Sequence, residues 1–212
     1  MGKPRVLLGD GRRMFLQGLD RLLSTNYDVV ATAADGREVL KAAVALSPDV
    51  IVVDLNLPSL NGLELSRRLL VKNQSSRIII LSRHADIHIA AAALAAGVKG
   101  FLVKEETVEA LEESIDSAMR GGRVVSEVLD QELLAQLLSD LDRRTSPATF
   151  ELTTRQKQVL PLLAEGLGLK EVGARLGISV KTVEFHKYGL MERLGARTSA
   201  ELVRYALVLG LE

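Results

Sequence analysis

Four side chains capable of phosphoryl chemistry each follow a short apolar segment of the chain. They are Asp10, Asp54, Ser82 and Lys104. A carboxylate such as that of Asp54 can attack a phosphoryl group as a nucleophile, while a hydroxyl and an ammonium group hold the phosphoryl oxygens. Each residue alone would be an ordinary turn former or helix cap. Four of them at matching positions indicate one shared site.

The apolar segments predict the elements that must position these side chains. Continuous apolar runs of this length are typical of strands buried on both faces, and they occupy residues 5–9, 29–32, 49–53, 78–81 and 100–103. Helical patterns lie between them, at about 12–24, 36–46, 62–72, 86–96 and 107–120. Alternating strands and helices predict a doubly wound α/β domain with a five-stranded parallel sheet. The carboxyl ends of such strands meet at one edge of the sheet.

The last sixty residues have the pattern of a helix-turn-helix. Thr153 and Gln156 have the spacing of a capping box, which starts a helix that runs through Ala164. A short helix, residues 170–176, then runs into Gly177, and Ser179 is a good N-cap for the next helix. Two helices joined by a tight turn, followed by a closing helix at about 199–209, indicate an all-α domain that reads the major groove of DNA.

The second helix of this motif predicts the residues that face DNA. Val183 and Leu190 fall on its core face. The residues expected in the groove are Lys181, Thr182, Glu184, Phe185 and Tyr188, with Lys187 on a phosphate.

Between the two domains, residues 126–142 predict a further helix with leucines at every fourth position. These are Leu129, Leu133, Leu137 and Leu141. Such a stripe packs on a neighbouring domain or forms a dimer seam, and the sequence leaves both open. The domains are therefore expected at 1–122, at 123–150 as a linker with a helix, and at 151–212.

Composition restricts the class of protein. The 212 residues suffice for two domains, no apolar run reaches the roughly 18 residues of a membrane span, and the chain has no cysteine. These features predict a cytoplasmic protein that does not bind membranes. The net charge is zero, with nine basic and seven acidic residues from 151 onward. So small a basic excess predicts that useful DNA binding needs two copies side by side.

These motifs, in this order, resemble the response regulators of the NarL/FixJ type, in which a receiver domain precedes a LuxR-type helix-turn-helix. Asp54, Pro58 and Gly62 match the spacing of the family's phosphoacceptor segment, and residues 96–104 match its aromatic-plus-lysine segment. The resemblance implies that a sensor histidine kinase phosphorylates Asp54. It also implies that Ser82 and Phe101 relay the change, and that a homodimer binds DNA. The family's members are transcription regulators, so the resemblance implies that this protein is not an enzyme.

One departure from the family concerns the metal. Receivers of this family carry two adjacent acids after the first strand to hold Mg²⁺, and here the second position is Gly11. Asp10, Asp54 and the carbonyl of Asn56 would then hold Mg²⁺ weakly or not at all. A sharper hypothesis is that Arg12 or Arg13 places a guanidinium against Asp54 or Asp10. The alternative is that both arginines lie in solvent.

Two other functions remain open from sequence alone. Gly11 and Arg12 favour a pseudo-receiver that binds DNA independently of phosphorylation, whereas the retained Asp54, Ser82 and Lys104 oppose it. A flavodoxin-like enzyme is the other alternative. The chain, however, lacks the third glycine of a dinucleotide-binding fingerprint after Gly9 and Gly11.

Overall fold

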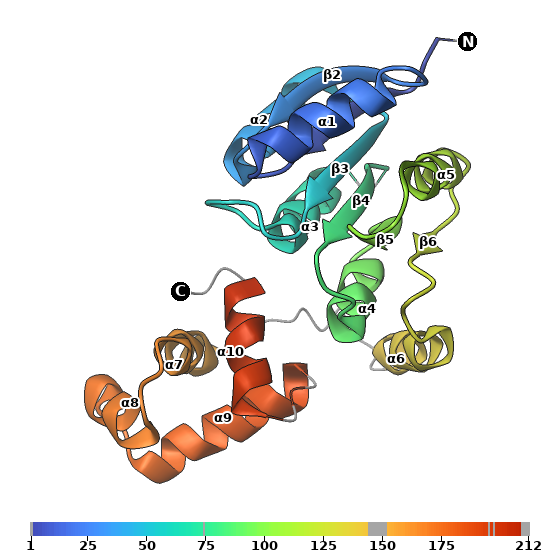
Figure 1. Cartoon of the computed structure of the whole chain (residues 1–212). Coiled ribbons are helices and arrows are strands. Elements are labelled where there is room, and N and C mark those ends of the chain that lie inside the picture. Colours follow the sequence, from blue (N-terminus) through green and yellow to red (C-terminus); the bar gives the residue numbers. More distant parts are fainter. Residues whose placement is uncertain (1, 74, 144–151, 195, 197, 209–212) are drawn as a thin grey trace. The chain divides into compact units, whose positions relative to one another are not determined.

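The computed structural model describes residues 2–208 except 74, 144–151, 195 and 197. It divides into two compact units, Met1–Arg143 and Arg144–Glu212. Figure 1 shows that the first unit holds the sheet and the second consists of helices. Each unit is described by itself.

The first unit is built on a parallel sheet in the order β2-β1-β3-β4-β5-β6. The strands are β1 (Arg5–Gly9), β2 (Asp28–Ala33), β3 (Val50–Asp54), β4 (Arg77–Ser82), β5 (Gly100–Val103) and β6 (Val124–Val125). All five neighbouring pairs are parallel, as the continuous apolar runs predicted. The doubly wound α/β fold is therefore confirmed.

The expected number of strands was wrong, because the described sheet has six rather than five. The sixth, β6, has only two residues and follows Gly121 and Gly122. It pairs with Gly100 and Phe101 of β5. Two valines after a glycine pair are too short a run for an apolar pattern to distinguish from a loop.

Five helices of the first unit alternate with its strands, and a capping side chain precedes each of them except the first. They are α1 (Arg13–Leu23), α2 (Gly36–Leu46), α3 (Gly62–Lys72), α4 (Ile87–Ala95) and α5 (Val108–Met119). Asp35, Asn61, Asp86 and Thr107 each accept a hydrogen bond from an N–H group in the first turn of α2, α3, α4 and α5. Each of the five helices lies within two residues of its predicted range.

Alternation along the strands builds a core between the sheet and α1 with α5. Val6 and Leu8 of β1, with Ile79 of β4, belong to one buried cluster that also contains Leu19 of α1 and Ile115 of α5. The intervening residues of these strands are also buried, and α2, α3 and α4 pack against the sheet as well. Burial on both faces explains why these strands contain almost no polar residue before their carboxyl ends.

The helix expected at 126–142 begins later, as α6 (Gln131–Arg143). Its start is set by Asp130, whose carboxylate accepts a hydrogen bond from the N–H of Leu133. Leu129 and Leu134 are buried, whereas Leu133 is exposed. Helix α6 packs on α4, so β6 and α6, both inside the predicted linker range 123–150, belong to the first unit. The side chain of Leu141 lies outside the described residues.

The second unit contains four described helices. These are α7 (Thr154–Ala164), α8 (Leu169–Leu176), α9 (Val180–Leu194) and α10 (Ser199–Val208). Helix α7 contacts the other three, and its core residues Val159 and Leu160 are fully buried, as are Val172 of α8 and Val183 of α9. Across both units, the described helices include none that is long and apolar enough to cross a membrane.

We expect the substitution Ile79→Ala to lower the free energy of unfolding by about 2–5 kcal/mol. The side chain is fully buried between β4, α1 and α5, and truncation leaves a cavity there. Urea unfolding followed by far-UV circular dichroism measures the change. The matched control is Val71→Ala on the exposed side of α3, which should change stability by at most about 0.5 kcal/mol. Equal effects of the two substitutions would contradict this view of the core.

Candidate functional site

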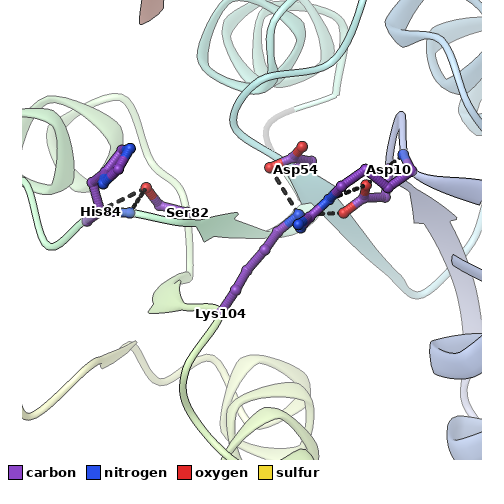
Figure 2. A network of polar contacts seen from close by, with 6 residues as sticks. Asp10, Asp54, Ser82, His84 and Lys104 are labelled. Atoms are coloured by element: carbon purple, nitrogen blue, oxygen red, sulfur yellow. Dashed lines mark hydrogen bonds and ion pairs between the residues drawn. The ribbon is translucent and has the colours of Figure 1, made fainter. Parts of the chain in front are cut away.

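Three of the predicted site residues meet at the carboxyl edge of the sheet. Asp10 follows β1, Asp54 ends β3, and Lys104 follows β5. Figure 2 shows the Lys104 side chain reaching between the two carboxylates. Its ammonium group donates a hydrogen bond to Asp10 Oδ2 and lies 3.0 Å from Asp54 Oδ1. The side chains of Lys104, Asp10 and Asp54 are 5%, 2% and 7% exposed, so these charges attract each other with little screening by water.

The backbone around Asp54 explains the spacing of its segment. A Cβ atom at Gly62 would lie 2.5 Å from the Asp54 carbonyl oxygen, so only glycine fits there. The N–H of Gly62 donates to the carbonyl of Leu55 at 2.8 Å. On the outer side of the loop, Ser59 donates a hydrogen bond to the Asp35 carboxylate, which lowers the pKa of Asp35. The loop after β3 is thus held at both ends.

The carboxylate of Asp54 has one oxygen without a hydrogen bond. Asp54 Oδ1 is buried and accepts no hydrogen bond from the described residues, although the Lys104 ammonium lies 3.0 Å away. The distance supports a Coulombic attraction between the two groups. Both oxygens of Asp10 accept hydrogen bonds, from the Arg12 N–H and from Lys104, whereas the Asp54 carboxylate faces the ammonium group through Oδ1. Asp54 is therefore the carboxylate best placed to react.

The structure does not bring the other predicted residues into this cluster. The Ser82 hydroxyl donates to the carbonyl of His84 at 2.9 Å and accepts from the N–H of His84, so it faces the next loop (Figure 2). Phe101 is fully buried in β5, opposite Ile80 of the neighbouring strand. Asn56 is half-buried in the loop after β3.

A residue that the sequence interpretation missed, Phe15, joins the site. The Lys104 ammonium lies 4.7 Å from the centre of the Phe15 ring, and the Arg12 guanidinium lies 5.1 Å from it, both within the range of cation–π attraction. Arg12 also places Nε 3.6 Å from Asp10 Oδ1, as the hypothesis about the two arginines proposed, while Arg13 is exposed. The sequence could have indicated this contact, because Phe15 follows Arg12 by three positions and a helix places residues at that spacing on the same side.

The residues of this pocket fit a divalent metal poorly. Asp10 and Asp54 supply two carboxylates, Gly11 supplies no side chain, and the buried Asp54 Oδ1 already faces an ammonium group. Within the described ranges, no group of three His, Cys, Asp or Glu residues could hold a metal ion. Mg²⁺ requires near-octahedral oxygen ligands, so a metal here would depend on water and on displacing Lys104.

In the second unit, the turn between α8 and α9 has the predicted geometry. Gly177 ends α8 with a φ angle of +65°, which a residue with a side chain rarely adopts. Ser179 caps α9 by accepting a hydrogen bond from the N–H of Thr182, and the two hydroxyls are 2.8 Å apart. The capping box of Thr153 with Gln156 is also present.

The outer side of α9 presents the residues expected to face DNA. Val183 and Leu190 are fully buried, which leaves the opposite side of the helix free. Phe185 and Tyr188 are 73% and 70% exposed, an unusual degree of exposure for large aromatic side chains. Lys181 and Glu184 are also exposed, and Thr182 and Lys187 are half-buried. This arrangement suits an element that enters a groove.

Comparison with known families identifies both units. The family described as response regulator receiver domain matches residues 6–116, and the family described as bacterial regulatory proteins, luxR family, matches residues 151–206. The chain belongs to the NarL/FixJ-type response regulators. It is thus a DNA-binding response regulator of two-component systems, and these matches favour neither the pseudo-receiver nor the flavodoxin-like enzyme.

Individual relatives match this response regulator over nearly its whole length. The oxygen regulatory protein NreC of Staphylococcus aureus is 33% identical over 209 residues, which cover 96% of each chain. RcsB of Salmonella enterica serovar Typhimurium, solved bound to a promoter with the phosphomimetic BeF3⁻, is 22% identical with a TM-score of 0.69 and covers 98% of this chain and 99% of its own. A structure of two RcsB dimers on two DNAs is 22% identical with a TM-score of 0.65, and covers 98% and 100%. At this identity, the two structures support the fold alone.

Lys104→Met tests the charge balance of the pocket. We expect it to lower the free energy of unfolding by about 3 kcal/mol, because two buried carboxylates then lack their shared cation. Urea unfolding measures the loss, and Lys41→Met on the exposed side of α2 should leave stability unchanged. The double variant Lys104→Met with Asp10→Asn should recover part of the loss. An equal loss in single and double variants would show that packing, rather than charge, is responsible.

Proposed function

We propose that Asp54 accepts a phosphoryl group from a phosphohistidine of a sensor histidine kinase, and that this modification controls DNA binding through α9 in the cytoplasm. The observation that carries the proposal is the position of the Asp54 carboxylate at the carboxyl edge of the sheet, with Oδ1 facing the Lys104 ammonium. It is supported by the receiver-domain match, which includes Asp54.

The chemical step is a transfer between two side chains. A carboxylate oxygen of Asp54 attacks the phosphorus of the phosphohistidine, an O–P bond forms, and the N–P bond breaks. The released imidazole keeps the electron pair of that bond and takes up a proton from solvent. The Lys104 ammonium, already beside Asp54, attracts the incoming phosphoryl oxygens, which carry the added negative charge.

The response to this step involves Ser82 and Phe101. The Ser82 hydroxyl is bonded within its own loop to His84, through contacts that are both with the backbone. A phosphoryl group on Asp54 offers strong acceptor oxygens at the end of the neighbouring strand, so Ser82 exchanges its His84 contact for a phosphoryl oxygen. The loop that leads to α4 then changes, and Phe101 repacks beside β4.

DNA binding by a homodimer is the other half of the proposal. Lys181, Thr182, Glu184, Phe185 and Tyr188 enter the major groove, and Lys187 contacts a phosphate. One helix-turn-helix with so small a basic excess binds weakly, whereas two on one duplex combine their affinities. The structure of two RcsB dimers on two DNAs is an example of such an assembly in another protein.

Acyl-phosphate formation tests Asp54 directly. Wild-type protein incubated with acetyl phosphate and Mg²⁺ should give a retarded band on a phosphate-affinity gel, and Asp54→Asn should give none, because an amide is not a nucleophile of this kind. Asp49→Asn is a matched control before β3 and should behave as wild type. A shift that persists in Asp54→Asn would place the acceptor elsewhere. If the wild-type band is retarded neither with acetyl phosphate nor with a phosphorylated histidine kinase as donor, the proposal is overturned.

The groove-facing residues are tested with duplexes selected from a random pool by the wild-type protein. Fluorescence anisotropy then measures affinity at several salt concentrations. Tyr188→Ala should weaken binding to the selected duplex by about 5- to 100-fold, the range for one lost base contact. Lys187→Ala, which removes the expected phosphate contact, should weaken binding to all duplexes and reduce the salt slope by about one. Lys41→Ala in the first unit is the control, and wild-type affinity in both α9 variants would exclude this face.

A further inference from the structure

We propose that this receiver neutralises its acid pocket with two cations of its own chain, Lys104 and Arg12, held on the ring of Phe15, so that it binds divalent metal only weakly. The inference deepens the proposed function, because it concerns the same pocket. It requires only the unphosphorylated protein, however, and can be tested separately.

The charges in the pocket balance without a metal. Asp10 and Asp54 carry two negative charges, and Lys104 and Arg12 carry two positive charges. Lys104 contacts both carboxylates, and Arg12 lies 3.6 Å from Asp10 Oδ1, the oxygen that Lys104 leaves free. That oxygen also accepts a hydrogen bond from the Arg12 backbone N–H at 2.8 Å. A metal ion would therefore enter a neutral pocket in which both oxygens of Asp10 accept hydrogen bonds and Asp54 Oδ1 faces an ammonium group.

The two cations contribute unequally. The Lys104 side chain is almost fully buried, so its attraction to the carboxylates is strong and a metal must displace it. The Arg12 side chain is 49% exposed, so its interaction with Asp10 is partly screened and its share is small. Lys104 therefore lowers the metal affinity strongly, whereas Arg12 lowers it only slightly.

Phe15 is a positioning residue in this arrangement. Its ring is partly buried and packs against the core shared by α1, α5 and the sheet. Both the Lys104 ammonium and the Arg12 guanidinium lie over this ring, at 4.7 and 5.1 Å from its centre. The ring attracts cations through its face, so it holds both near the carboxylates. An aliphatic side chain of similar size would fill the space without that attraction.

The position of Gly11 allows the missing ligand to be restored. Gly11 is exposed, and an added Cβ would lie 3.1 Å from Cδ of Pro58, so an aspartate fits after a shift of that ring. Gly11→Asp then supplies a third carboxylate beside Asp10.

The test measures binding of Mn²⁺, a probe for oxygen-ligand sites, to the unphosphorylated full chain by electron paramagnetic resonance of the free ion. We expect Arg12→Gln to tighten binding by up to about fivefold, in proportion to a half-exposed ion pair. Gly11→Asp should tighten it by about tenfold or more, because it adds a ligand and a charge. Arg13→Gln, the exposed neighbour, should bind as wild type and is the matched control.

Phe15 is tested by a pair of substitutions. Phe15→Leu should tighten Mn²⁺ binding as Arg12→Gln does, and Phe15→Tyr, which keeps the aromatic face, should retain the wild-type affinity. Circular dichroism verifies the fold of each variant, and Arg12→Gln decides the case if Phe15→Leu does not fold. The proposal is wrong if Arg12→Gln and Arg13→Gln bind alike, or if wild type binds as tightly as Gly11→Asp. If the protein binds Mn²⁺ as expected but Asp54 accepts no phosphoryl group from any donor, only the proposed function is refuted.

Discussion

Two ionised carboxylates side by side in a buried pocket need a positive charge beside them, and Lys104 supplies it. Asp10 follows β1, Asp54 ends β3 and Lys104 follows β5, and β4 lies between the last two strands. Neighbouring strands are roughly 4.8 Å apart, so a residue after β5 must reach across β4 to touch Asp54. The long stem of lysine makes this crossing. Ser82, at the end of β4, has a short side chain, and its hydroxyl faces its own loop.

The sequence predicted most of the first unit because burial on both sides of a parallel sheet leaves a strong pattern. The runs around Val6, Ile51 and Ile79 could hardly be anything but inner strands, and the polar residue after each run marked the edge where the site lies. The start of α6 was not predictable in the same way. Its boundary depends on the hydrogen bond from Leu133 to Asp130 rather than on the leucine spacing.

Within the site, sequence identified the residue types but not their pairing. The cluster of Asp10, Asp54 and Lys104 follows from the topology. The orientation of Ser82 follows from a competing partner, His84, which only the folded loop brings within reach. Phe15 was missed because an aromatic residue in the first turn of α1 suggests core packing, and its contact with two cations depends on a residue about ninety positions further along the chain. In α9, by contrast, helical periodicity was enough to separate Val183 from Phe185.

The short strand β6 has a consequence for the association of one molecule with another. An uncovered parallel edge at β5 would offer a row of free N–H and C=O groups to any extended chain. Here β6 pairs with the first part of β5, and the hydroxyl of Ser126 accepts a hydrogen bond from the N–H of Val103, beyond the last paired residue. The N–H of Ser126 donates to the carbonyl of Phe101. Two valines and one serine thus occupy backbone groups of β5 that another extended chain would otherwise pair with at this edge.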